Sequence, residues 1–165
     1  MPPGKSAGVK LKPIDSTWTS EVQGDQASTG YRYLAVWVVV TPESATTGVD
    51  EVSLDRVLHV RYKPSGTSCG STQQVAASGH CYTLGRPGSQ LHLLDDEPWR
   101  EREWARGEFV PSDVAAGETR AGQIGFQIAD GIEVTDFELC APTAEEDSDP
   151  EKYPCTPVKA PDGLR

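Results

Sequence analysis

The stretch from Tyr31 to Thr41 constrains the fold of this chain more than any other. It reads Tyr-Arg-Tyr-Leu-Ala-Val-Trp-Val-Val-Val-Thr, the longest apolar run in the sequence, and it is rich in the β-branched and aromatic residues that favour strands. Alternate side chains of a strand point to opposite faces, and both sets are largely apolar here. Its eleven residues are too few to cross a membrane as a helix. We therefore expect a central strand that is covered on both faces and ends at Pro42, which cannot donate to a ladder.

Short β-segments precede and follow this strand. Residues 9–22 carry two alternating stretches that Pro13 separates, and a proline within a strand indicates a sheet edge. Residues 52–62 fit a strand, with one or two helical turns as the alternative. Shorter apolar runs occur at 81–84 and 91–94.

The clearest alternation lies near the C-terminus. Residues 119–128 place apolar side chains on one face and glutamine or glycine on the other. Asp130 and Gly131 form a strong hairpin-turn signal, so we expect residues 132–139 to return beside this strand, with a β-bulge near Thr135. Seven or eight short strands and no convincing helix predict an all-β protein, an antiparallel immunoglobulin-like β-sandwich.

The chain is expected to form one domain with short appendages, given its 165 residues. Residues 1–8 are rich in proline, glycine and lysine and are predicted to be a disordered N-terminal segment. Residues 9–140 are assigned to the sandwich. Residues 141–165 contain five prolines and an acidic run, the composition of a tail. Because Cys155 lies in this tail, we expect a disulfide to tie it back, most economically to Cys140.

The four cysteines bear on folding and on cellular location. An even number with no Cys-x-x-Cys motif suggests two disulfides and an oxidising compartment. Three pairings are possible, and the local one, Cys69–Cys81 with Cys140–Cys155, is favoured because it closes two short loops. Four reduced, buried thiols are the alternative.

The net charge and the N-terminal residues limit which binding partners and which cellular locations we expect. The net charge is −10, which disfavours nucleic acid and anionic membrane surfaces and is otherwise typical of a soluble surface. Residues 1–6 lack the apolar region of a signal peptide. If the cysteines are bridged, we expect an extracytoplasmic chain, secreted or membrane-anchored, whose signal or anchor has been removed. We expect no direct insertion of this chain into a membrane.

A family resemblance rests on an opening strand of the kind seen at residues 9–22 and on four motifs that follow it. The motifs are Gly-Tyr-Arg-Tyr-Leu-Ala-Val-Trp-Val-Val-Val (30–40), Val-Pro-x-x-x-x-Ala-Gly-Glu-Thr (110–119), Arg-Ala-Gly-Gln-Ile-Gly-Phe-Gln-Ile (120–128) and Gly-Ile-Glu-Val-Thr-Asp-Phe-Glu-Leu (131–139). Over residues 8–140 the chain resembles the extracytoplasmic immunoglobulin-like domains of unknown function grouped with the small secreted immunoprotective antigens of actinobacteria. The resemblance implies a β-sandwich outside the cytoplasm, often behind a lipoprotein or membrane anchor, and no catalytic residues.

No motif in the sequence points to catalysis or to a cofactor. There is no Gly-x-Ser-x-Gly. His80 and Cys81 with Cys69 could form half a zinc site, but their spacing does not support one. The Asp95–Glu97 cluster or the carboxylates of the tail could bind calcium, yet neither has EF-hand spacing and a solvated acidic face is the better interpretation. We therefore expect neither an enzyme nor a cofactor or metal.

The segment 95–108 is the best sequence candidate for a partner contact. It interleaves tryptophans with arginines, a composition typical of interfaces; these residues are Trp99, Arg100, Arg102, Trp104 and Arg106. The alternative is that both indole rings pack onto the sandwich.

These observations favour a non-enzymatic binding or accessory module on a bacterial cell surface, with a protein or glycan as its partner and the loops of residues 64–108 as its contact region. One alternative is a self-associating structural or assembly domain. The other is a hydrolase that joins His59 or His92 to the Asp95–Glu97 cluster.

Overall fold

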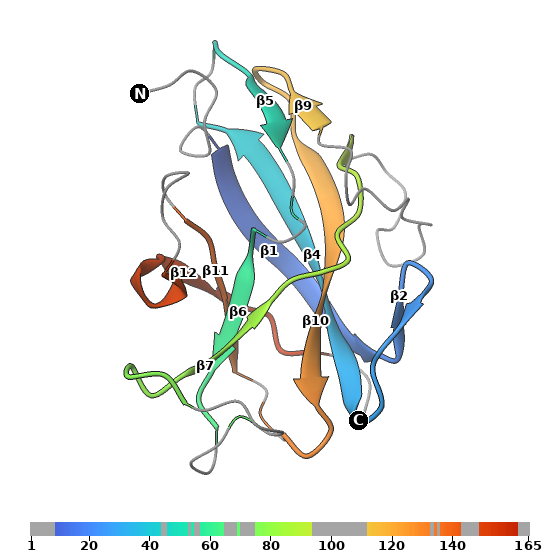
Figure 1. The fold of residues 1–165 in the computed structure, drawn as a ribbon. Coiled ribbons are helices and arrows are strands. Elements are labelled where there is room, and N and C mark those ends of the chain that lie inside the picture. Colours follow the sequence, from blue (N-terminus) through green and yellow to red (C-terminus); the bar gives the residue numbers. More distant parts are fainter. Residues whose placement is uncertain are drawn as a thin grey trace.

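Strands make up nearly all of the regular structure (Figure 1). The computed structural model of the chain describes residues 9–43, 46–52, 54, 57–64, 69, 75–93, 112–132, 134, 136–142 and 149–161. The described residues form β1 (Val9–Thr19), β2 (Glu21–Val22), β3 (Asp25–Gln26), β4 (Tyr31–Pro42), β5 (Val49–Val52), β6 (His59–Tyr62), β7 (Cys81–Leu84), β8 (His92–Leu93), β9 (Ser112–Val114), β10 (Arg120–Ala129), β11 (Phe137–Cys140), the 3-10 turn η3 (Pro150–Lys152) and β12 (Cys155–Val158). The all-β prediction is confirmed. The twelve strands over these residues are more numerous and more uneven than the seven or eight expected, since β1, β4 and β10 have 11, 12 and 10 residues.

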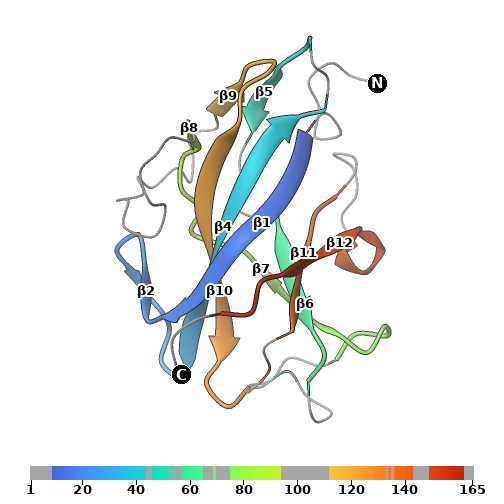
Figure 2. The ribbon, with the colours of Figure 1, turned by 180° about the vertical axis from the view of Figure 1, so that it is seen from behind.

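The strands form two four-stranded sheets that share one core. The first sheet has the order β1-β4-β10-β8 and the second β12-β11-β6-β7, and all their pairings are antiparallel. Figures 1 and 2, viewed from opposite sides, show the second sheet lying against the first. The side chains buried between them come from both sheets: Leu34, Val36, Val38, Ile124, Phe126, Val60, Tyr62, Phe137, Leu139 and Val158. Apolar burial on this scale is the main stabilising term of the fold.

β4 is the central strand that its composition predicts. It pairs with β1 on one side and with β10 on the other. Leu34, Val36 and Val38 are fully buried in the shared core. Tyr33 and Ala35, which point the opposite way, are buried too. The expectation of cover on both faces is therefore confirmed.

A small hairpin covers the second face of β4. The pairing of β2 with β3 brings Val22 against Tyr33 and Ala35, which form a separate buried cluster. Gly125 of β10 lies under this hairpin, where an added Cβ would meet Tyr33 and Val22. The polar face of β10 also helps to hold the hairpin, because the Gln23 Nε2 donates to the backbone oxygen of Gln123 at 3.2 Å.

β1 is an edge strand, as its proline predicts. It has β4 on one side only, and its register shifts between Pro13 and Asp15. Such an irregularity accommodates a residue that cannot donate to the ladder. Residues 9–19 nevertheless form one continuous strand rather than two.

Two predictions about how the strands are arranged are wrong. Residues 52–62 do not form one strand, since β5 pairs with β9 whereas β6 belongs to the second sheet. The expected hairpin at residues 119–139 is absent as well, because β11 pairs with β6 and β12 rather than with β10. The turn itself forms, with Ile132 N–H donating to the Ala129 oxygen at 3.0 Å. Thr135, the centre of the expected bulge, lies outside the described residues.

The reason is that the edge of β10 is already occupied. β8 pairs with Arg120 and Ala121, and the chain just before β8 bonds to the next part of β10. There Arg86 N–H donates to the Gly125 oxygen and Ser89 N–H to the Gln123 oxygen, each at 2.8 Å. The apolar side chains of β11 are buried instead in the core shared by the two sheets.

Part of the expected tail belongs to the fold. β12 is the outer strand of the second sheet, beside β11. Beyond it, the Ser16 Oγ donates to the backbone oxygen of Lys159, and Lys159 Nζ lies 3.6 Å from Asp15 Oδ1. The segment after β12 is thus attached to β1 next to the irregularity in its register.

Candidate functional site

The outer face of the second sheet carries two rows of side chains. Val60, Tyr62 and Leu139 point into the core, so the residues that alternate with them point outward. The strand register aligns these outward residues across the sheet. Cys155, Cys140, His59 and Leu84 lie side by side and are called here the disulfide row; Pro157, Glu138, Arg61 and Tyr82 are called the charged row.

A short segment, residues 149–154, covers the disulfide row and is called here the strap. Asp149 Oδ1 accepts from Glu151 N–H at 3.1 Å and so caps the 3-10 turn at its start. Tyr153 is only 8% exposed, and its ring packs edge-on against His59 with 5.8 Å between centroids. The strap is also held to the turn before β7, because Ser78 N–H donates to Glu151 Oε1 at 3.0 Å.

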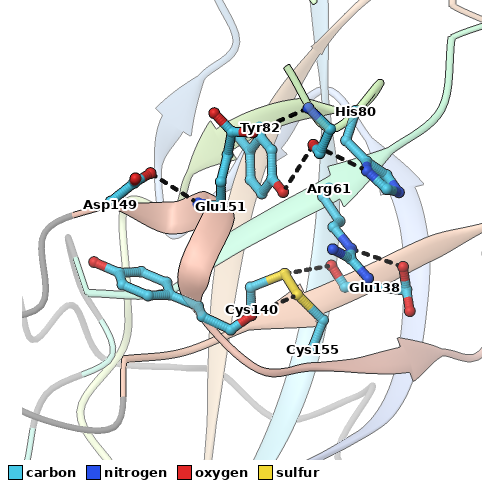
Figure 3. The surroundings of a disulfide bond; sticks show 10 residues. Arg61, His80, Tyr82, Glu138, Cys140, Asp149, Glu151 and Cys155 are labelled. Atoms are coloured by element: carbon cyan, nitrogen blue, oxygen red, sulfur yellow. Dashed lines mark hydrogen bonds and ion pairs between the residues drawn. A yellow bond between two sulfur atoms is a disulfide. The ribbon is translucent and has the colours of Figure 1, made fainter. Parts of the chain in front are cut away.

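The Cys140–Cys155 disulfide fixes one end of the strap. It joins residues that are directly opposite on β11 and β12 and 15 apart in sequence (Figure 3). The Cys140 sulfur lies 3.9 Å from the backbone oxygen of Glu138, and the Cys155 sulfur lies 3.5 Å from the backbone oxygen of Tyr153. Because sulfur in a disulfide carries no proton, these are packing contacts. The bridge therefore cross-links β11 to β12 at the end of the strap.

His59 is a partly buried titratable group under the strap. Burial lowers its pKa below the usual 6.5. Its Nδ1 is inaccessible to solvent and has no hydrogen-bond partner in the described part of the chain. A neutral imidazole that fills space under Tyr153 accounts for both observations.

The charged row remains partly open to solvent. Arg61 Nε donates to Glu138 Oε1 at 2.8 Å, and the two side chains are 23% and 34% exposed. This hydrogen bond raises the pKa of Arg61, and a further bond with Tyr82 adds to the effect. An exposed pair of this kind adds at most about 1 kcal/mol to stability. Its main effect is to hold both groups in one geometry.

Two polar side chains, Ser78 and His80, extend the row beyond β7. The Tyr82 Oη lies 3.4 Å from the Ser78 Oγ, which lies 3.2 Å from His80 Nδ1. The rings of His80 and Tyr82 meet edge-on, 6.1 Å apart (Figure 3). Burial, with Arg61 and Lys63 nearby, lowers the pKa of His80 and favours a neutral ring at pH 7. Hydroxyl, imidazole, guanidinium and carboxylate groups thus form one connected strip.

The contact between Ser78 and His80 resembles one part of a serine hydrolase site. A serine hydrolase needs a carboxylate that orients the histidine, and within the described ranges no hydrogen bond joins a carboxylate to His80. The hydrolase hypothesis named other residues. His59 and His92 lie in different sheets, and the Asp95–Glu97 cluster falls outside the described residues.

The cysteines pair as favoured from the sequence, Cys69 with Cys81 and Cys140 with Cys155. No cysteine is free, so the alternative of four reduced thiols and the half-site for zinc are both wrong in this structure. The Tyr62 Oη donates to the Cys69 oxygen at 3.3 Å, and burial raises the pKa of this tyrosine to about 12. The described residues contain no group of three or more side chains suited to a metal ion.

Five residues were predicted from the sequence to contact a partner. Trp99, Arg100, Arg102, Trp104 and Arg106 all lie outside the described residues. Sequence reasoning in turn missed Arg61, Tyr82 and Glu138. The sequence shows only that polar residues alternate with apolar ones in three short strands. These polar residues can be recognised as neighbours only when the register of the three strands is known.

A groove lies elsewhere, between the start of β1 and the neighbouring strands β11 and β12 of the second sheet. It encloses about 450 Å³ and is mostly apolar, lined by Val9, Leu11, Glu43, Leu139, Ala141, Pro142, Pro154 and Thr156. It offers few groups that could orient a ligand.

Comparison with known protein families, curated proteins and solved structures found no match. The candidate site therefore rests on the geometry of this chain alone.

Proposed function

We propose that this chain is a non-enzymatic, extracytoplasmic binding module with an immunoglobulin-like sandwich fold, acting at a bacterial cell surface on a protein or glycan. The observation that carries the proposal is the charged row with its extension to Ser78 and His80. These polar side chains are partly exposed, mutually oriented, and mounted on a sheet that a disulfide and the strap hold rigid. Two antiparallel sheets around one core support the fold assignment.

The sheet edges favour binding through a face rather than by strand addition. β1 contains Pro13 and an irregular register, and β12 contains Pro157. The other two outer strands, β7 and β8, have four and two residues. Prolines, bulges and short edge strands all discourage pairing with another chain. This makes self-association through edges the weaker alternative.

One observation supports a location outside the cytoplasm. All four cysteines are in disulfides, which persist in oxidising compartments. Among the described residues, no helix has the length and apolar character needed to cross a membrane.

The test is binding of the labelled, oxidised chain to cell-envelope fragments from an actinobacterium, measured by co-sedimentation. We expect saturable binding that Arg61→Gln weakens about tenfold, since hydrogen bonds to charged groups contribute about 1.5–3 kcal/mol. Arg120→Gln is the matched control, because Arg120 pairs with Glu118 at the same 2.8 Å outside the proposed site. Absence of saturable binding, or equal weakening by both variants, would contradict the proposal.

Sedimentation velocity over a concentration series examines the self-association alternative. A monomer at all concentrations is expected. A dimer that forms in the micromolar range, together with no binding to envelope fragments, would favour the assembly function instead.

A further inference from the structure

We propose that the open half of this face is a subsite for a neutral, hydroxyl-rich oligosaccharide. The inference rests on the proposed binding function and names its ligand class. The subsite, called here the glycan strip, consists of Glu138, Arg61, Tyr82, Ser78 and His80, which come from β11, β6, β7 and the turn before β7.

The strip alternates hydrogen-bond donors with acceptors. The bond between Arg61 and Glu138 uses Nε and Oε1. An arginine carries five N–H donors and a carboxylate has two oxygens, so both residues keep capacity for a ligand. A sugar hydroxyl donates and accepts at once, and it can therefore bridge a guanidinium N–H and a carboxylate oxygen. The hydroxyls of Tyr82 and Ser78 continue the same pattern.

The aromatic groups of the strip add an apolar contact. Tyr82 and His80 meet edge-on at 6.1 Å, and both are partly exposed. Rings of this kind present a large, rigid and amphipathic surface at low entropic cost. The C–H face of a pyranose ring is apolar while its rim is polar. Such a ring can pack on Tyr82 or His80 while its hydroxyls reach Arg61 and Glu138.

The local charge favours a neutral ligand over an anionic one. The strip, the strap and the adjacent Lys63 together carry three basic groups, Arg61, Lys63 and Lys152, and three acidic groups, Glu138, Asp149 and Glu151. The chain as a whole carries −10. A sulfated or phosphorylated glycan would be repelled by the whole molecule without finding a net positive surface here. A neutral oligosaccharide meets no such barrier.

The rigidity of the strip also favours a weakly interacting ligand such as a sugar. β6 and β11 are interior strands of the second sheet. The Arg61–Glu138 bond fixes the two charged side chains, and the Cys140–Cys155 bridge lies directly beside Glu138. Groups that are ordered before binding lose little conformational entropy when the ligand arrives.

The experiment repeats the co-sedimentation with envelope fragments that have been treated beforehand. One sample is oxidised with periodate, which cleaves the vicinal diols of sugars, and then quenched before the chain is added. A second sample is digested with protease and washed. We expect periodate to abolish binding and protease to leave it unchanged. We also expect Glu138→Gln and Tyr82→Ala to weaken binding at least about tenfold, with Glu118→Gln as the matched control without effect.

Each other outcome has a defined meaning. Loss of binding after protease but not after periodate indicates a protein partner, which overturns the glycan inference and leaves the proposed function intact. No saturable binding to untreated fragments overturns both. Competition by heparin, a polyanionic glycan, overturns the claim of a neutral ligand. Thermal unfolding of each variant is recorded, and Tyr82→Phe, which keeps the ring and loses the hydroxyl, replaces Tyr82→Ala if the latter does not fold.

Discussion

The absence of a side chain at Gly125 allows the β2–β3 hairpin to pack closely on the first sheet. An added Cβ would lie 2.8 Å from Tyr33 Cδ1 and 3.1 Å from Val22 Cγ2, and the backbone of Gly125 is bonded to Arg86 and Pro87, so it cannot easily move. We predict that Gly125→Ala lowers the free energy of unfolding by about 1–3 kcal/mol, the usual cost of overpacking.

Urea unfolding measures this, with Gly131→Ala as the control. Nothing lies within 4 Å of a Cβ at Gly131, so its substitution should be nearly neutral. Equal stability of the two variants would show that the β2–β3 hairpin does not press on the first sheet.

His59 gives the chain a predictable response to acid. Because burial lowers its pKa in the folded state, the unfolded chain takes up this proton more readily once the pH falls below 6.5. The free energy of unfolding should therefore decrease as the pH falls below this value. His59→Gln should show a smaller loss of stability between pH 7.5 and pH 5.0 than the parent chain.

The comparison of the two chains by urea unfolding at each pH isolates His59, since the carboxylates and His80 titrate in both. An identical pH dependence would mean that the strap does not bury the imidazole.

At the level of elements, the sequence predicts a strand better than it predicts the partner of that strand. β4 was predictable because a run that is apolar on both faces can only be central. β7 has the bounds expected of residues 81–84. The partner of β11 was not predictable from the Asp130-Gly131 turn, because the choice depends on residues 86–93 occupying the edge of β10.

The glycan strip was hidden for the same reason. His80 and Tyr82 are close in sequence, but Arg61 and Glu138 come together only through the pairing of β6 with β11. Alternation shows which side chains point outward in a strand, whereas register decides which of them become neighbours. A site that spans several strands therefore requires the topology before it can be recognised.

The two disulfides lead to different predictions. Cys140→Ser with Cys155→Ser removes a bridge that closes a separation of 15 residues, which should lower stability by about 3 kcal/mol. Hydrogen exchange should then accelerate most in β12 and the strap, since this bridge fastens them to β11.

Cys69→Ser with Cys81→Ser is the matched control, because that bridge spans 12 residues and should cost a similar amount. Its removal should leave exchange in β12 unchanged. Uniform acceleration in both variants would mean that the strap is not an independently fastened segment.

On the scale of the whole molecule, the edge strands of the sheets and the net charge both oppose self-association. Two of the four edge strands, β1 and β12, contain a proline, and the net charge of −10 opposes close approach of two copies. The molecule thus combines a surface that resists self-association with one face on which opposite charges are balanced. This combination supports the proposal that a single copy of the chain binds an uncharged partner.

The salt dependence of binding tests this electrostatic view. If the glycan strip binds a neutral ligand, raising the ionic strength from about 50 to about 500 mM should change the dissociation constant less than about twofold, because no net charge is neutralised in the complex. Co-sedimentation at several NaCl concentrations measures the slope. An anionic ligand held by Arg61 would instead dissociate as salt rises, while a cationic partner attracted to the acidic chain would lose affinity still more steeply. Arg61→Gln separates these two cases, since it should weaken the binding of an anionic ligand and strengthen the binding of a cationic one.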